Sequence, residues 1–576
     1  MPLSLLFLPL LFALVSVGVA WPVVARLGLS PSEKLVSSVG LSLLAAFLVE
    51  WAIYVFALPA AAIWLLPVMA AGGVAFRWPE LRGTWRDDSV RVMAAGQVLV
   101  LACSLGWMAT IASYSGGGWA GDWYEHWERT RFYLERWPLD SKFLDQYALT
   151  ARPPLVNVVT AAFLSLTRVD YVHFQIVITL LAAASFLPAA LLALRWGGAR
   201  AVSVLAVLAM VNPYFVQNST FAWTKFPAAF FVLIAFYFFL RARDPDSPGS
   251  APVLFAASLA AGILAHYSAG PYALLLAGAW IFVGVRRRRD RAWWSTTSAM
   301  AAVCVGLLAT WFGWAFATYG VSGTLLTNTS VTAADARSAN QLVKMGLNLL
   351  DTLIPHFLRP MDRSLITQSS PWGWLRDWFF QCYQLNLPLA FGSLAWLAIG
   401  RELLREAKTA SRPDRIFWGY FIAGLVVLGT AASGERDHWG LAHICLHALV
   451  LIGLAFLAAC WPRLGSPWRI ALILGGAFDL MFGIVLHFGV QSFALDRWLA
   501  PGKSLQDVFE ASSYAAKLNL LGKLRHQVVF LSDALAPPFV LVAVAELLVL
   551  GLALRRAMSS AIGRPGLSPI EKSSKP

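Results

Sequence analysis

The sequence predicts a polytopic all-α membrane protein, and its composition, its apolar runs and the placement of its charges each indicate this class. Of its 576 residues, 58% are hydrophobic and 13% are charged, and the mean hydropathy is +0.64. Soluble domains carry charge on about a quarter of their residues, so this chain is too apolar to be one. Roughly 20 apolar helical residues cross a bilayer core about 30 Å thick.

Runs of this kind recur along the chain, and about 15 transmembrane helices are expected. The expected spans are 3–22, 36–55, 57–75, 92–113, 172–193, 199–215, 222–240, 251–267, 271–285, 297–318, 385–400, 415–432, 439–460, 469–488 and 533–555. The interruption at 57–59 leaves two interpretations open, because the second and third spans could instead form one kinked span.

The charges predict which side each loop faces. The first twenty residues contain no Lys or Arg, whereas Arg26 and Lys34 follow, so we expect a retained span with the N-terminus outside. With the spans alternating from that start, 27 of the 45 Lys and Arg face the cytoplasm with 11 acidic residues, against 18 and 17 outside. This asymmetry follows the positive-inside rule and places the C-terminus in the cytoplasm of a plasma or inner membrane. The basic pI therefore reflects orientation and does not indicate nucleic-acid binding.

Several function classes lack a site on this chain. The cytoplasmic loops are short, and the sequence contains no Walker motif and no GxGxxG that opens a helix after a strand. ATP-driven transport and use of a cytosolic nucleotide sugar are therefore disfavoured. The five cysteines show no CxxC spacing and are interpreted as core residues. No internal repeat is evident, which weakens the case for a carrier built from inverted halves.

Three long outer loops, 114–171, 319–384 and 489–532, are expected to carry function or to fold into interfacial helices. The first contains an acidic and aromatic segment with tryptophans four residues apart and acidic residues three apart: Trp119, Trp123, Trp127, Asp122, Glu125 and Glu128. A tryptophan stripe suits the headgroup layer. The carboxylates form either the solvated face of an interfacial helix or a reactive site at the membrane surface. The position of Asp122, just beyond a span, favours the site.

Arg152-Pro153-Pro154-Leu155 opens an apolar run that ends at Leu166. Proline is tolerated in a first helical turn. An arginine fixed there could bind a phosphate through two parallel hydrogen bonds, or it could snorkel towards the headgroups. Lys225 and His266 lie at the outer ends of spans, where each is either a phosphate ligand or a structural residue.

Together these segments resemble the GT-C class of integral-membrane glycosyltransferases, particularly the protein O-mannosyltransferase and aminoarabinose transferase-like branch. That family has an Asp-containing motif in its first large outer loop, followed by a segment similar to Arg152-Pro153-Pro154-Leu155. The segments 212–214, 224–227 and 261–267 are similar to its later helix boundaries. If 92–113 is the family's first helix, the loop 319–384 falls where the family has its second catalytic loop.

The resemblance covers about 92–400 and implies a division of the chain. Residues 1–91 would form additional N-terminal helices, 92–400 a GT-C-like catalytic membrane module, 401–556 the C-terminal helices, and 557–576 a disordered cytoplasmic tail. The chain departs from the family at two places. Family members often have paired acidic residues where this chain has Asp122 and Glu125 three apart, and they often carry Lys or Arg near the position of His266.

The resemblance implies inverting transfer of a sugar from a polyprenyl-phosphate donor to an acceptor at the extracytoplasmic face. Asp122 is expected to be the general base, with Glu125 as the second catalytic candidate. The candidates for substrate binding are Arg152, Lys225, His266, Tyr267, His356 and Arg359. Either fixed cations or a divalent metal would stabilise the leaving phosphate; no metal ligand and no certain cofactor is predicted. The sugar and the acceptor, whether glycan, lipid or protein, stay open.

Two other classes remain as alternatives. A transporter or flippase of lipid-linked sugars would need ionisable groups along the membrane midplane, whereas the charges here gather at the outer boundary. An assembly or scaffold protein without activity is the third interpretation. The acids inside spans, Glu50, Asp479 and Glu546, are interpreted as structurally paired rather than functional.

Overall fold

The described part of the chain is helical, and its one β-type contact is an isolated bridge between Phe143 and Tyr147. The computed structural model describes residues 3–110, 122–144, 147–285, 290–326, 390–431 and 446–485, with short pieces at 342–343, 345–346, 544, 546–548, 551–552 and 554–556. Its α-helices are α1 (Leu3–Gly18), α2 (Trp21–Val24), α3 (Pro31–Val55), α4 (Leu65–Phe76), α5 (Trp78–Arg86), α6 (Asp88–Thr110), α7 (Asp122–Glu135), α8 (Leu155–Leu166), α9 (Tyr171–Ala183), α10 (Phe186–Val211), α11 (Pro213–Thr220), α12 (Lys225–Arg241), α13 (Ala251–Ala265), α14 (Gly270–Val285), α15 (Arg291–Leu325), α19 (Ala390–Thr409), α20 (Arg412–Ala431), α21 (Leu446–Cys460) and α22 (Ser466–Ile484). Short 3₁₀ turns lie at η1 (Ala60–Trp64), η3 (Leu149–Ala151), η4 (Tyr267–Ala269) and η9 (Trp461–Arg463).

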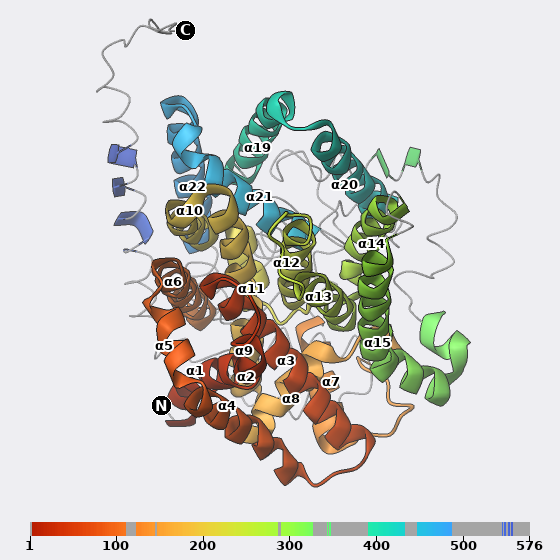
Figure 1. The fold of residues 1–576 in the computed structure, drawn as a ribbon. Coiled ribbons are helices and arrows are strands. Elements are labelled where there is room, and N and C mark those ends of the chain that lie inside the picture. Colours follow the sequence, from red (N-terminus) through yellow and green to blue (C-terminus); the bar gives the residue numbers. More distant parts are fainter. Residues whose placement is uncertain are drawn as a thin grey trace, which may run out of the picture.

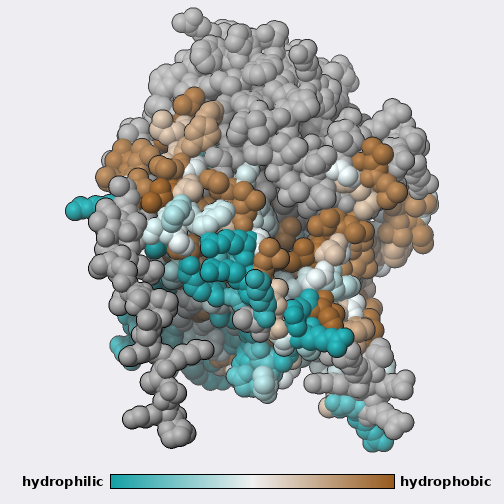
Figure 2. All heavy atoms as spheres, turned by 90° about the horizontal axis from the view of Figure 1, so that it is seen from above, coloured by the Kyte–Doolittle hydropathy of each residue, from teal (hydrophilic) through white to brown (hydrophobic). Residues whose placement is uncertain are grey.

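Six helical stretches in the described residues are long and apolar enough to cross a membrane, and up to eight are if each of two sharply bent helix pairs counts as one span. Shorter apolar helices, including α8 and α13, accompany them. On the face drawn in Figure 2, exposed apolar residues flank a hydrophilic middle. The predicted class, a multi-pass helical membrane protein, is therefore confirmed, whereas the count of about 15 helices stays a prediction.

Glycine sets one of the breaks between predicted spans. Helices α9 and α10 together form an apolar stretch, Tyr171–Val211, which is interrupted at Gly198. Gly198 has φ 71° and ψ −169°, a conformation that a residue with a Cβ rarely adopts. The break falls between the predicted spans 172–193 and 199–215.

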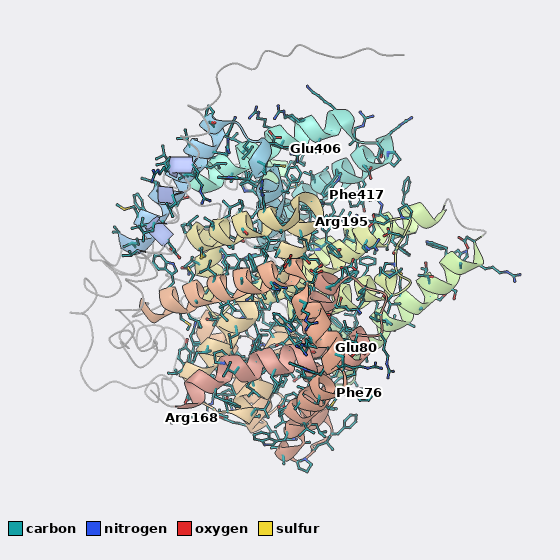
Figure 3. All side chains as sticks on the ribbon, turned by 60° about the vertical axis from the view of Figure 1, so that its left-hand side comes forward. Phe76, Glu80, Arg168, Arg195, Glu406 and Phe417 are labelled. Carbon is teal, nitrogen blue, oxygen red and sulfur yellow. The ribbon has the colours of Figure 1, made fainter. Side chains whose placement is uncertain are left out.

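Contacts between helices sort the molecule into two ends. At one end, ion pairs join segments that the sequence places in the cytoplasm: Arg241 with Glu33, Arg195 with Asp244, and Arg243 with Asp414. At the other end, hydrogen bonds join predicted outer segments: Tyr267 to Thr150, Thr150 to Gly323, and Tyr319 to Leu139. Figure 3 shows Arg195 and Glu80 towards one side and Arg168 on the opposite side. These contacts fit the predicted alternation of the spans; which end faces outward stays a prediction.

Helices α7 and α8, from the first predicted outer loop, are packed into the bundle beside α3 (Figure 1). Nearly every residue of α8 is buried, and residues 124–130 of α7 are all buried. Trp127 packs against Tyr171 and Phe174 with ring centroids 5.9 and 5.2 Å away. The solvated-face interpretation of Glu125 and Glu128, and the headgroup interpretation of Trp127, are therefore wrong, because protein covers these side chains.

The acids inside predicted spans are buried in the protein. Glu50 is 4% exposed, and the charge of Arg136 acts on it from the end of α7. Glu546 contacts the thiol of Cys103 on α6. Asp479, on α22, is fully buried. The contact of Glu546 and the opposite charge of Arg136 near Glu50 agree with the expectation of structural pairing.

Candidate active site

One face of helix α7 carries the charged residues of the candidate site. Residues 122, 125, 126 and 129 follow the i, i+3/i+4, i+7 spacing of a single helical face. The side chains of Glu125, His126 and Arg129 are at most 2% exposed. Residue 122 shares this face by register, because α7 begins at Asp122, but the Asp122 side chain lies outside the described part of the structure. The helix therefore presents Glu125 and Arg129 towards the segment before α8, and His126 towards Asn157 on α8.

Glu125 is ion-paired to two arginines. Arg129 Nε donates to its Oε1 at 2.7 Å, and Arg152 Nη2 lies 3.5 Å from its Oε2. The first contact spans one helical turn, and the second joins α7 to the residue just after η3. Because Glu125 is fully buried, its charge is balanced by these guanidinium groups rather than by water.

Arg129 also fastens the segment that leads to Arg152. Its Nη1 and Nη2 donate to the carbonyl oxygens of Leu149 and Ala148 at 2.8 and 2.9 Å. Its guanidinium lies 4.3 Å from the ring centroid of Phe143. A buried arginine with five donors in a fixed fork can hold a carboxylate and two carbonyls at once.

Two further hydrogen bonds hold the same segment from the other side. The Tyr267 hydroxyl donates to the Thr150 carbonyl oxygen at 3.1 Å, and the Thr150 hydroxyl donates to the Gly323 carbonyl oxygen at 2.8 Å. The segment 148–151 is thus bonded to α7, η4 and α15. Arg152 follows it directly, so the backbone of this arginine is fixed before any ligand arrives.

Arg152 is the more accessible arginine of the pair, with 17% of its side chain exposed against 1% for Arg129. Its guanidinium lies 5.6 Å from the ring centroid of Tyr147. Helix α8 begins at Leu155, directly after Pro153 and Pro154, as the sequence predicts. Arg152 therefore lies where a helix begins, beside a buried carboxylate and at the edge of solvent.

Lys225 and His266 lie within electrostatic reach of Arg152. The charges of Arg152 and Lys225 are the two largest charge effects on the His266 imidazole. Lys225 is the first residue of α12, after a 112° bend that separates α12 from α11, and its ammonium lies 4.5 Å from the Trp223 ring centroid. His266 directly follows α13 and precedes η4, and its Nδ1 accepts from the Ser268 backbone N–H at 3.0 Å. We call Glu125, Arg129, Arg152, Lys225 and His266 the cation cluster.

The protonation states of the two acid–base groups on α7 follow from burial and charge. Burial alone would raise the pKa of Glu125, but the guanidinium groups of Arg152 and Arg129 outweigh it and hold the pKa below its ordinary value. Burial lowers the pKa of His126 to about 3, and the nearby arginines add to this effect. Glu125 is therefore a carboxylate and His126 a neutral imidazole near neutral pH. Nδ1 of His126 lies 3.3 Å from the side-chain oxygen of Asn157, to which it can donate.

The structure brings together five of the predicted site residues, Glu125, Arg152, Lys225, His266 and Tyr267, from four distant parts of the chain. The other three predicted site residues are not placed: the side chain of Asp122, and all of His356 and Arg359, lie outside the described residues. Sequence reasoning missed Arg129 and His126 as site residues. The i, i+4 spacing of Glu125 and Arg129 was a usable signal, because such pairs meet on a helix.

A metal site finds no support in the part of the chain that is described. There, no three His, Cys, Asp or Glu residues lie close enough together to hold a metal ion. The charge in the described cluster comes instead from guanidinium and ammonium groups.

The fold and the site thus define a helical multi-pass membrane protein with a buried cation cluster at one end. No protein-family model and no curated protein matches this chain. Two crystal structures are similar to it, ArnT from Cupriavidus metallidurans bound to undecaprenyl phosphate and the same protein in the apo state. The TM-scores are 0.46 and 0.45 and the identities 15% and 16%; each alignment covers 81% of this chain and 77% of the other.

Proposed function

We propose that this chain is a membrane glycosyltransferase that transfers a sugar from a polyprenyl-phosphate donor to an acceptor at the extracytoplasmic face. The observation that carries the proposal is the cation cluster, which gathers Arg152, Lys225 and His266 beside the helical face that includes residue 122. The sequence motifs at the same residues resemble the family that performs this reaction. The similar ArnT crystal structure holds undecaprenyl phosphate, which belongs to the class of lipid that the proposed reaction would release.

In the proposed reaction, the oxygen of an acceptor hydroxyl attacks the anomeric carbon of the donor sugar. The bond between that carbon and the phosphate oxygen breaks, its electron pair stays on the phosphate, and the configuration inverts. The hydroxyl proton passes to the carboxylate of Asp122, the proposed general base. The products are the glycosylated acceptor and a free polyprenyl phosphate.

Arg152 and Lys225 stabilise the charge that develops on the departing phosphate. Fixed cations in a site with little water stabilise the transition state strongly, because little water screens their charge and their side chains need not rearrange during the reaction. Arg152 suits this role because its backbone is already held by the hydrogen bonds of segment 148–151. Tyr267 acts through this segment, as a positioning residue.

Glu125 fits the role of a positioning residue better than that of a second base. A carboxylate paired with two guanidinium groups has little basicity, since its pKa is held below the ordinary value. Its two ion pairs instead fix Arg152 relative to α7. We therefore propose that Asp122 accepts the proton and that Glu125 orients the arginine that grips the phosphate.

The test is release of polyprenyl phosphate by the full-length protein in vesicles, supplied with polyprenyl-phosphate sugars and an envelope glycan and lipid fraction. Asp122→Asn should remove release of polyprenyl phosphate and formation of glycosylated product while the protein still folds and inserts. Asp140→Asn is the matched control, because Asp140 is an exposed carboxylate in the same predicted loop, outside α7. Normal turnover by Asp122→Asn would eliminate Asp122 as the base. Movement of the intact lipid-linked sugar across the vesicle without any covalent product would favour a flippase instead.

A further inference from the structure

Helices α4 and α5 form a sharp corner at the end of the molecule opposite the cation cluster. Their axes differ by 77° across the break at Arg77. The last residue of α4, Phe76, is 68% exposed, and the Arg77 guanidinium lies 5.0 Å from its ring centroid. In Figure 3, Phe76 and Glu80 lie close together on the two sides of this corner. A span with an exposed apolar face ends here, and the chain turns to run across the span direction.

Around helix α5, the residues change from buried ones to exposed tryptophans and then to exposed arginines. Leu81 and Thr84 are buried and point towards α3 and α6. At 100° per residue, Trp85 and Trp78 come next around the helix, and Arg82 and Arg86 follow them. Both tryptophans are exposed, at 53% for Trp78 and 41% for Trp85, and both arginines are exposed. We call Trp78, Arg82, Trp85 and Arg86 the α5 stripe.

The two arginines of the stripe differ from their basic neighbours in their pairing. Arg77 bonds to Glu80 at 2.7 Å, and Arg91 lies 3.4 Å from Asp88. Arg82 and Arg86 have no ion pair with any residue in the described part of the chain, although acidic side chains lie on the same short segment. Their charges are therefore available to an external anion.

We propose that the α5 stripe binds the headgroups of anionic phospholipids in the leaflet at this end, which the charge distribution predicts to be the cytoplasmic one. Tryptophan rings are favoured at the boundary between acyl chains and headgroups, where the end of the apolar α4 surface places this pair. Arginines one step further around the helix meet the phosphate layer, and their charge is complementary to it. The corner between α4 and α5 supplies the geometry, because it lays the stripe along the membrane surface. This inference is independent of the proposed enzymatic activity.

The experiment counts the lipids that the full-length protein retains when it is purified from vesicles containing equal amounts of phosphatidylglycerol and phosphatidylcholine. Native mass spectrometry should show that the wild-type protein retains more phosphatidylglycerol. In the double variant Arg82→Gln/Arg86→Gln, the preference should fall by about fivefold per cation, the fold-change that corresponds to roughly 1 kcal/mol each. Arg82→Lys/Arg86→Lys should keep the preference, because it keeps the charge.

The matched control is Arg200→Gln/Arg412→Gln, which removes two exposed arginines from the same predicted side but away from α5. Equal retention of the two lipids by the wild type, or equal losses in the stripe and control variants, would overturn the proposal. So would retention of a second protein copy at α5 in place of lipid. If Arg82→Gln/Arg86→Gln fails to fold, the midpoint of thermal unfolding of the wild-type protein in each lipid tests the proposal instead. It should rise more in phosphatidylglycerol than in phosphatidylcholine, and 1 M salt should remove the difference; equal midpoints contradict the proposal.

Discussion

Replacing Glu125 with glutamine tests the central interaction of the site, because it removes the charge and keeps the shape. Glu125 is fully buried and pairs with Arg129 at 2.7 Å and Arg152 at 3.5 Å. Removing one partner of a buried ion pair costs about 3–5 kcal/mol, since the remaining charge stays buried without its counter-ion. Arg129 keeps two carbonyl acceptors and its contact with Phe143, so we expect the lower end, about 3 kcal/mol.

Thermal unfolding followed by tryptophan fluorescence measures this loss, with Glu135→Gln as the control. Glu135 sits on the same helix and pairs with Arg131, but it is 37% exposed, so its removal should cost less than about 1 kcal/mol. The two variants should also differ in acid. The folded-state pKa of Glu125 lies below its ordinary value of 4.5, so its contribution to stability is present above pH 4.5 and is lost as pH falls through the folded value. Glu125→Gln should lack this loss.

Activity separates the positioning role from a catalytic one. If Glu125 orients Arg152, Glu125→Gln should weaken the binding of undecaprenyl phosphate and raise KM more than it lowers kcat. Asp122→Asn should act on kcat. Equal midpoints for the Glu125 and Glu135 variants would refute the buried ion pair. A dead Glu125→Gln enzyme with wild-type stability and wild-type lipid binding would make Glu125 the base and refute the assignment to Asp122.

Three further changes test the site and its scaffold. Arg152→Gln should weaken undecaprenyl phosphate binding by roughly 10- to 100-fold, which corresponds to the free energy of one hydrogen bond to a charged group. Arg131→Gln should leave the binding unchanged. Equal binding by both variants would exclude Arg152 from the site. His126→Asn should reduce the loss of stability in acid. The pKa of His126 in the folded protein is about 3, so wild-type stability should decline by about 1.4 kcal/mol per pH unit as pH falls from 6.5 towards 3. An unchanged slope in the variant would contradict this. Gly73→Leu should lower the yield of folded protein, because a Cβ at this position overlaps the Gly18 carbonyl oxygen. Gly72→Leu should be tolerated, because a Cβ there meets no atom within 4 Å. Equal yields of the two variants would show that α1 and α4 do not pack this closely.

Fold class could be predicted from the sequence because a lipid environment imposes long apolar runs and a charge asymmetry that are visible residue by residue. The break at Gly198 inside α10 could be predicted in the same way, since it falls between two predicted spans and glycine permits its φ of 71°. The start of α8 could be predicted from the two prolines, although they lie directly before Leu155 rather than in the first helical turn. These features depend on local sequence alone.

The surroundings of α7 could not be predicted in this way. Its spacing of acidic, basic and aromatic residues is equally typical of a solvated interfacial helix and of a buried one. The difference comes from α3, α8 and α9, whose side chains cover it: Tyr54 contacts Phe132, for example, and Phe174 contacts Trp127. Arg129 is buried by this packing and does not face solvent, so its guanidinium links Glu125 to segment 148–151. Such long-range packing leaves little trace in a single sequence.

One buried carboxylate shared by two arginines distinguishes the cation cluster from the ion pairs on the surface at this end. On that surface, Arg131 pairs with Glu135 and Arg168 pairs with Asp170. In the cluster, Glu125 serves both Arg129 and Arg152, and Lys225 adds a further cation near His266. Arg152 is the partly exposed one of the two arginines that pair with Glu125, so a phosphate that reaches the cluster from the lipid would meet it first. For this reason we expect the proposed phosphate beside Arg152 rather than elsewhere on this surface.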